Sequence, residues 1–222
     1  MVERIAANMK DMILGGQDGL VNVLGVILGI AAATSDMRII LAGGFAATFA
    51  ESISMAAVAY TSTIASVDYY ESTKKNEERS IEENPEMEIQ KIRDVYAARG
   101  FEGDLLDQIV TKITSDKTRW VEVMMLEELR LSPATKNGAL WSALIVGLSA
   151  MVGSFVPLVP FFFFSVKAGV IVSLIVSSLA LFGAGAFKAK ITVGYWLKSG
   201  IQMLVIGLVS ALLGYYIGYL FS

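Results

Sequence analysis

Two carboxylates lie inside stretches of sequence that are otherwise apolar: Asp18 in GGQDGLVNVLGVILG and Glu51 in GGFAATFAESISMAAVAY. A carboxylate inside a bilayer costs about 2.5–3.5 kcal/mol on insertion scales, so it needs a compensating partner. Asn22 follows Asp18 by four residues and Met55 follows Glu51 by four, which places each pair on one side of a helix. If these two sides meet, their carboxylates, amide and thioether form a candidate site for a divalent cation. The alternative is that each acid is only hydrogen-bonded at a helix interface.

A second set of candidate ligands lies between residues 68 and 136. The stretch RWVEVMMLEELRL holds Met124 and Met125 about one helical turn before Glu128, so that thioethers and a carboxylate can converge on one ion. Adjacent methionines are more often core residues than ligands, which leaves a purely structural interpretation open. The acids of the preceding run would by themselves form a solvated surface; they are Glu77, Glu78, Glu82, Glu83, Glu86 and Glu88.

The residue types also restrict the ion. The chain has no Cys and no His, which excludes disulfides, thiolate zinc sites and imidazole ligands. Carboxylates combined with thioethers suit Fe(II) or Mn(II) better than Zn or Cu. Because a metal ligand must be deprotonated, protonation of the same carboxylates would weaken metal binding. A proton gradient could therefore drive a transport cycle.

The elements that must carry these residues are membrane-spanning helices. Hydrophobic residues make up 55% of the 222-residue chain and charged residues only 18%, whereas about 25% of a soluble domain is charged. Apolar runs long enough to cross a bilayer cover residues 12–33, 39–67, 139–159, 166–187 and 199–221. The predicted fold class is an all-α integral membrane protein with five transmembrane helices.

The segment 68–136 differs in composition, because it holds 16 of the 21 acids and 11 of the 18 basic residues. The second span is expected to continue as a helix into this segment, and Asn84 and Pro85 are expected to start a new helix that Gly100 ends. Further helices are predicted over GDLLDQIVTKI and TRWVEVMMLEEL. The expected organisation is transmembrane helices 1 and 2 in residues 1–67, a cytoplasmic helical metal-binding domain in 68–136, inserted between the second and third spans, and transmembrane helices 3 to 5 in 137–222.

The distribution of Lys and Arg predicts the orientation of the chain. With the N-terminus in the cytosol, sixteen of these residues lie inside and only two, Arg38 and Lys167, lie outside. Cytoplasmic segments near membrane spans carry an excess of Lys and Arg. The N-terminus and residues 68–136 are therefore expected in the cytosol, in the plasma membrane or in the membrane of an internal storage compartment.

Four motifs in this order resemble the vacuolar iron transporter family: DGLV at 18–21, SM at 54–55, NPEME at 84–88 and WVEVMMLEEL at 120–129. The resemblance implies export of ferrous and manganous ions from the cytosol against protons, by a homodimer whose paired first spans form the path. It assigns Asp18 and Met55 to the path, and metal binding in the cytoplasmic helices to Glu77, Glu88, Met124, Met125 and Glu128. The chain departs from the family pattern where a glutamate would fall on Ala47, Ser80 or Lys91, and Glu51 replaces a second path residue.

The expected function is a transporter that exports divalent metal ions by proton antiport, with metal ligands at Asp18, Glu51, Met55, Glu77, Glu88, Met124, Met125 and Glu128. Fe²⁺ or Mn²⁺ would be the transported substrate; the expected partners are protons, the lipid bilayer and a second copy of the chain. We expect no prosthetic group, no enzymatic activity and no nucleic-acid partner. One alternative is a membrane-anchored ferritin-like protein that binds or oxidises iron without transporting it, although such sites usually include His. Another is a transporter of an organic solute with a regulatory cytoplasmic bundle.

Overall fold

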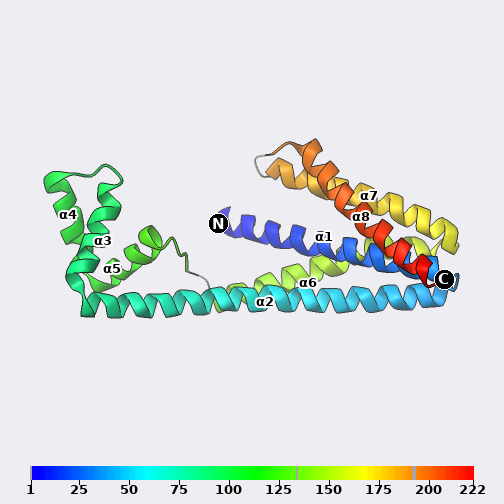
Figure 1. Ribbon diagram of the computed structural model, residues 1–222, viewed down its shortest axis with the longest axis horizontal. Coiled ribbons are helices and arrows are strands. Elements are labelled where there is room, and N and C mark those ends of the chain that lie inside the picture. Colours follow the sequence, from blue (N-terminus) through cyan, green and yellow to red (C-terminus); the bar gives the residue numbers. More distant parts are fainter. Residues whose placement is uncertain (1, 134, 192–193) are drawn as a thin grey trace. The chain divides into compact units, whose positions relative to one another are not determined.

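The computed structural model describes residues 2–133, 135–191 and 194–222, and every regular element among them is a helix (Figure 1). The predicted all-helical fold is therefore confirmed. In chain order the elements are α1 (Val2–Ala33), α2 (Met37–Glu83), α3 (Pro85–Ala97), α4 (Gly103–Thr114), α5 (Lys117–Val123), a π-helical turn η1 (Met124–Glu128), α6 (Lys136–Leu158), a 3-10 turn η2 (Val159–Phe162), α7 (Val166–Ile191) and α8 (Trp196–Leu220).

The chain divides into two compact units. The membrane unit consists of Met1–Tyr60 and Ala139–Ser222, and the inserted unit consists of Thr61–Gly138. Because this division falls within α2, that helix contributes residues to both units. The candidate ligands are divided in the same way, with Asp18, Glu51 and Met55 in the membrane unit and the others in the inserted unit.

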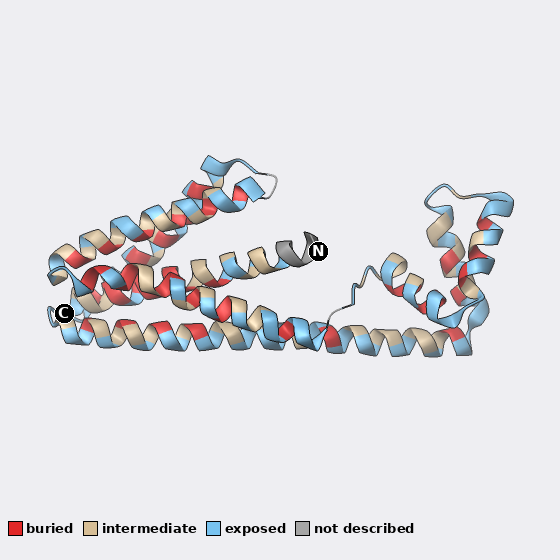
Figure 2. Ribbon diagram, turned by 180° about the vertical axis from the view of Figure 1, so that it is seen from behind, coloured by how far each residue is buried: buried red, intermediate tan, exposed pale blue. Residues whose placement is uncertain are grey.

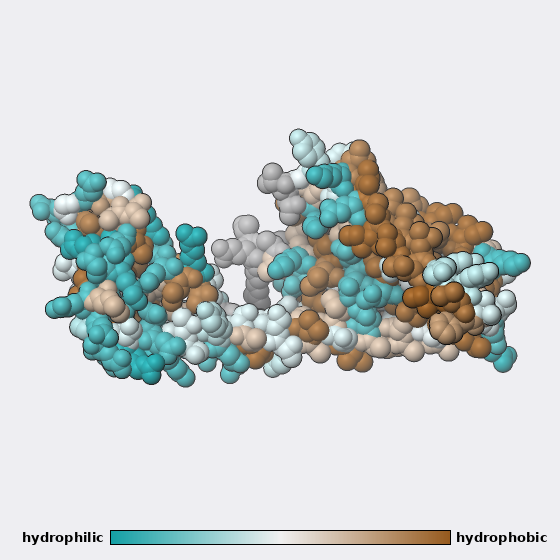
Figure 3. Space-filling model, in the orientation of Figure 1, coloured by the Kyte–Doolittle hydropathy of each residue, from teal (hydrophilic) through white to brown (hydrophobic). Residues whose placement is uncertain are grey.

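The membrane unit has the helices and the surface of an integral membrane protein. Among the described residues, five helices are long and apolar enough to cross a bilayer, which matches the five predicted spans. Large apolar side chains such as Val152, Leu179 and Leu212 point outward from these helices, and Figure 3 shows a continuous hydrophobic surface over α7 and α8. Such a surface suits lipid rather than water.

Small residues allow the helices of the membrane unit to approach closely. A Cβ atom on Gly19 would lie 2.2 Å from the Ala150 carbonyl oxygen of α6, and one on Gly153 would lie 2.1 Å from the Gly16 carbonyl oxygen of α1. Helix α8 packs against both α1 and α7. The glycines around Asp18 therefore lie where α1 approaches α6 most closely.

The inserted unit has its own hydrophobic core. Buried residues of all its helices form this core: Ile81, Ile92, Leu106, Val110, Ile113, Trp120, Val121, Met124 and Met125. Helix α3 packs against α4, and α4 packs against α5. Figure 2 shows the buried positions alternating with exposed ones along these amphipathic helices.

Three details of the inserted unit bear on the sequence predictions. Helix α3 begins at Pro85 and Gly100 follows it with φ +89°, as the turn signals predicted. Asn84 occupies the capping position, but its side chain makes no capping hydrogen bond. The helix predicted over TRWVEVMMLEEL is α-helical only to Val123, because the Leu129 amide donates to the Met124 carbonyl, five residues back, at 3.1 Å.

Candidate metal centres

The first candidate centre is the membrane pair, which we define as Asp18 of α1 and Glu51 of α2. The Glu51 carboxyl lies within hydrogen-bonding reach of both Asp18 and Asn22. The Asn22 amide also donates to Oδ2 of Asp18 at 3.3 Å. The helix sides that carry the two acids therefore meet, and one amide joins them.

Packing against α6 positions both helices of the membrane pair. Gly15, Gly19 and Gly16 of α1 approach the backbone of α6 around Val146, Ala150 and Gly153. On α2, a Cβ atom on Gly147 of α6 would lie 3.1 Å from the Ser52 carbonyl oxygen, next to Glu51. Helix α6 thus contacts both α1 and α2 close to the two acids. These contacts hold α1 and α2 at a short distance from each other.

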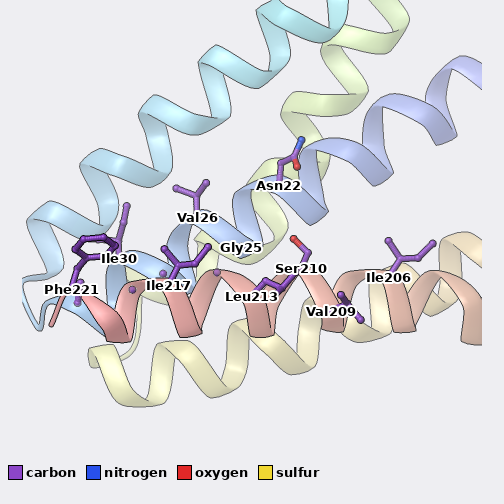
Figure 4. Close-up of a pocket in the computed structure, with 14 residues that line it drawn as sticks. Asn22, Gly25, Val26, Ile30, Ile206, Val209, Ser210, Leu213, Ile217 and Phe221 are labelled. Atoms are coloured by element: carbon purple, nitrogen blue, oxygen red, sulfur yellow. The ribbon is translucent and has the colours of Figure 1, made fainter.

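Asn22 also marks the end of a groove between α1 and α8. This groove has a volume of about 700 Å³. Figure 4 shows Val26 and Ile30 of α1 and Leu213 and Ile217 of α8 along it, with Asn22 and Ser210 as its polar side chains. The groove is therefore a mainly apolar surface that follows α1 from Asn22 toward Ala33.

Met55 lies one helical turn beyond Glu51 on α2 and is half-buried. The spacing of four residues keeps its thioether on the same side of α2 as the Glu51 carboxyl. The membrane pair thus offers carboxylate and amide oxygens, with a thioether one turn away.

The second candidate centre is the glutamate cluster, which we define as Glu77 of α2, Glu88 of α3 and Glu128 of η1. These three acids surround the ammonium of Lys91, whose Nζ lies 3.0 Å from Oε1 of Glu88 and 3.9 Å from Oε1 of Glu128. Glu88 is 0% exposed, and its Oε1 also accepts a hydrogen bond from the Ser80 hydroxyl at 2.6 Å. Three helices thus converge on one buried charge network.

The second oxygen of each acid in the glutamate cluster is buried without a hydrogen-bond partner. These oxygens are Oε2 of Glu77, Glu88 and Glu128. Buried carboxylate oxygens are normally hydrogen-bonded, paired or bound to a metal ion. The cluster therefore has unused capacity for a cation or for proton donors.

The electrostatics of the glutamate cluster follow from burial and from its single positive charge. Burial raises the pKa of Glu128 above its usual value, and the nearby Glu88 adds to this effect while Lys91 opposes it. Burial acts against the charge of Lys91, but its hydrogen bond to Glu88 and the carboxylates of Glu128, Glu88 and Glu77 outweigh burial and raise its pKa. Lys91 is therefore held in its charged form by the three acids.

Met124 and Met125 are both fully buried in the core of the inserted unit. They pack with Ile81, Ile92 and Trp120, as expected for the structural interpretation of adjacent methionines. The π-helical turn that contains them ends at Glu128, so the same turn connects the core to the glutamate cluster. Within the described part of the chain, no three His, Cys, Asp or Glu side chains are grouped closely enough to hold one metal ion.

The acids of both candidate centres were predicted as metal ligands from the residues and from the family resemblance, and that role stays a prediction. The position of Lys91 was not predicted. The sequence shows Lys91 three residues after Glu88 on α3, a spacing that favours an ion pair on a helix. The ion pair between Lys91 and Glu88 could therefore be predicted from the sequence. The approach of Glu77 and Glu128 could not, because it depends on the packing of three helices. Ser80 was equally unrecognised as a hydrogen-bond donor to Glu88.

Comparison with known proteins gives one family and several relatives. A family model described as the VIT family matches residues 9–219. The chain is 31% identical to vacuolar iron transporter 1 of Tulipa gesneriana, over 93% of this chain and 84% of that protein. It is 28% identical to vacuolar iron transporter 1 of Arabidopsis thaliana, over 91% of this chain and 82% of that protein. It is also 30% identical to Protein CCC1 of Saccharomyces cerevisiae, over 91% of this chain and 66% of that protein.

Proposed function

This chain belongs to the VIT family, and we propose that it transports metal ions out of the cytosol. The proposed cargo is a divalent ion, Fe²⁺ or Mn²⁺, which is exchanged for protons. Its five long apolar helices fit an integral membrane protein. Its similarity to proteins named as iron transporters supports metal ion transport. The divalent cargo, the exchange with protons and the direction are our proposals. They rest on the chemistry of the two candidate centres.

The contact between Asp18 and Glu51 is the observation that carries the proposal. Two carboxylates this close repel each other unless a proton or a cation lies between them. In a bilayer the cost of such a pair is high, and intramembrane acids commonly mark ion or proton pathways. A site that alternately holds a metal ion and protons would account for both acids.

Proton coupling follows from the same ligands. A carboxylate binds metal only when it is deprotonated, so a proton and a metal ion compete for the membrane pair. On the acidic side of a membrane, protons displace the metal ion; on the cytosolic side, the metal ion displaces the protons. This competition would use a proton gradient to move metal out of the cytosol.

The inserted unit would supply metal ions to the membrane pair from the cytosol. Its acids outnumber its basic residues, which favours attraction of cations. Oxygen ligands suit Fe²⁺ or Mn²⁺ in both centres, and the membrane pair has the Met55 thioether one helical turn away. The relatives' names favour the membrane of a vacuole or a similar storage compartment as the location.

We also propose a homodimer with α1 at its centre. Asn22 is exposed and Asp18 only half-buried in the single chain, and polar groups in a membrane protein usually face the protein interior or a water-filled cavity. A second copy over the groove between α1 and α8 would shield both residues from lipid. A monomeric mass in detergent and in lipid nanodiscs would contradict this assembly.

Metal uptake into proteoliposomes tests the transport proposal. We expect Fe²⁺ and Mn²⁺ to accumulate when the lumen is more acidic than the outside, and accumulation to fall at least about tenfold in Asp18→Asn and in Glu51→Gln. These substitutions keep the size of each side chain but remove its charge. If proton-coupled uptake is unchanged in Glu51→Gln, the proposed role of the membrane pair is wrong.

Asp36→Asn is the matched control, because Asp36 is an exposed acid in the connection between α1 and α2. Its carboxylate accepts from the Arg38 amide at 2.8 Å, and asparagine can accept the same hydrogen bond. Uptake should therefore stay at the native level in this variant. Metal that is bound by the native protein but never enters the lumen would instead favour the ferritin-like alternative.

A further inference from the structure

Lys91 occupies the centre of the glutamate cluster. Its Nζ contacts Oε1 of Glu88 at 3.0 Å and lies 3.9 Å from Oε1 of Glu128, and Glu77 contributes to the same electrostatic environment. The ammonium therefore stands where the charges of three carboxylates converge. In this position the ammonium compensates negative charge of the carboxylates, as a bound metal ion would.

The network remains incomplete with Lys91 in place. Three carboxylates and one ammonium leave two negative charges uncompensated when all are ionised. Oε2 of Glu88 belongs to a side chain that is 0% exposed, and it has no hydrogen-bond partner. Buried carboxylate oxygens are normally hydrogen-bonded, paired or bound to a metal ion, so this oxygen is able to accept a further ligand.

The side chain of Lys91 is able to leave the cluster. It is 33% exposed, whereas Glu88 is completely buried. Lysine carries its charge on four flexible methylene groups, so the ammonium can move to solvent while the helix backbone stays in place. The acids come from three different helices and remain behind. Their side chains would have to close around an incoming ion, because no three of them in the described part of the chain lie close enough together to hold one.

We propose that the Lys91 ammonium is a built-in cation of the glutamate cluster and that a divalent metal ion binds there only by displacing it. The ammonium and a divalent ion would share Oε1 of Glu88, and their mutual repulsion at that distance prevents simultaneous binding. Lys91 thus sets a threshold: the cluster takes up metal only when the cytosolic concentration is high enough to compete. This inference rests on the proposed metal transport for the identity of the ligand.

Binding of Mn²⁺ to the full-length protein in detergent tests this inference. The measurement uses the Asp18→Asn background, so that loss of a carboxylate weakens any binding at the membrane pair. In this background we expect Lys91→Met to bind Mn²⁺ at least about tenfold more tightly than the chain with Lys91, because methionine removes the competing charge and keeps most of the side-chain length. Adding Glu88→Gln to Lys91→Met should abolish this gain.

Lys112→Met is the matched control, since Lys112 is an exposed residue of α4 in the same unit and its loss changes the net charge equally. It should leave Mn²⁺ affinity unchanged, which separates local competition from the general attraction of a more negative protein. Equal Mn²⁺ affinity with and without Lys91 would overturn the inference. So would an equal gain in Lys112→Met.

A second variant covers the case in which Lys91→Met does not fold. Lys91→Arg keeps a positive charge that can bind two carboxylates at once, so it should bind Mn²⁺ about threefold or more weakly than the chain with Lys91. Native affinity in Lys91→Arg would then contradict competition. Metal uptake by the chain with native Asp18 is a separate measurement, so failure of the transport proposal and failure of this inference are distinguishable.

Discussion

The Ser80 hydroxyl donates a hydrogen bond to a carboxyl group that is completely buried. Its Oγ donates to Oε1 of Glu88 at 2.6 Å, and Glu88 is 0% exposed. Hydrogen bonds to charged groups contribute about 1.5–3 kcal/mol, and a buried acceptor that loses its donor has no water to replace it. We predict that Ser80→Ala lowers the free energy of unfolding of the metal-free inserted unit by about this amount.

Urea unfolding of the full-length protein would measure this loss, in a background with Trp141→Phe and Trp196→Phe, so that the fluorescence reports Trp120 in the core of the inserted unit. Ser72→Ala is the control, because Ser72 is exposed on the same helix and surface substitutions usually stay within about 0.5 kcal/mol. Equal stability of the two variants would mean that solvent, rather than Ser80, satisfies the Glu88 carboxylate.

At the scale of single residues, the acids of the candidate centres are easier to recognise in the sequence than the groups they contact. Asp18 and Glu51 stand out because each is an isolated charge in an apolar run, and each was expected beside its Asn22 or Met55 neighbour at helical spacing. Lys91 could not be placed in the same way, since its contact with Glu128 joins residues that are 37 positions apart. Such contacts depend on tertiary packing, which spacing along one helix does not encode.

At the scale of helices, the approach of α1 to α6 depends on positions that cannot hold a side chain. A Cβ atom on Gly153 would lie 2.1 Å from the Gly16 carbonyl oxygen and 3.0 Å from the Gly16 Cα atom. Backbone atoms cannot move aside as a flexible side chain could, so the two helices must separate. We predict that Gly153→Ala destabilises the membrane unit by about 1–3 kcal/mol, the usual cost of overpacking.

The thermal midpoint of the protein in detergent, measured together with its yield on size exclusion, reports this change. Gly183→Ala of α7 is the matched control, because a Cβ atom there meets nothing within 4 Å. Alanine should be neutral or slightly stabilising at that position, since glycine lowers helix stability by about 0.5–1 kcal/mol. A similar loss in both variants would contradict a specific role for the contact between α1 and α6.

The sequence predicted the existence of the helices more accurately than their ends and their type. All five apolar runs are helices, because twenty or more consecutive apolar residues leave few alternatives. The continuation of α2 to Glu83 was also expected, since the charged residues after the span favour a helix. The π-helical turn at Met124–Glu128 was not expected. It forms because a backbone amide donates to the carbonyl five residues back instead of four, and this change depends on the packing of the buried core.

At the scale of the whole molecule, charge and apolar surface are separated along the chain. Residues 137–222 contain no acid, and the segment 68–136 contains 16 of the 21 acids. The apolar helices of the membrane unit therefore need lipid, while the inserted unit carries a solvated surface and its own core. This separation could be predicted from composition alone. Net charge and hydrophobicity are sums over many residues, so a wrong interpretation of one position changes them little.

The direction of the proposed transport depends on which side of the membrane holds the inserted unit. Sixteen of the eighteen Lys and Arg residues fall on one side when the N-terminus is cytosolic, and Lys and Arg are retained on the cytosolic side during insertion. We therefore predict that Ser72, in α2 within the inserted unit, is cytosolic and that Ser35, between α1 and α2, lies on the opposite side.

A chain without cysteine allows this orientation to be read from single substitutions. Ser35 and Ser72 are both exposed, so Ser35→Cys and Ser72→Cys offer the same thiol on opposite sides. In intact cells that carry the protein in the plasma membrane, an impermeant maleimide should label Ser35→Cys at once and Ser72→Cys only after permeabilisation. The reverse pattern would place the inserted unit outside the cytosol, where it would collect metal for import, because the acids that attract the cation would then face the other compartment.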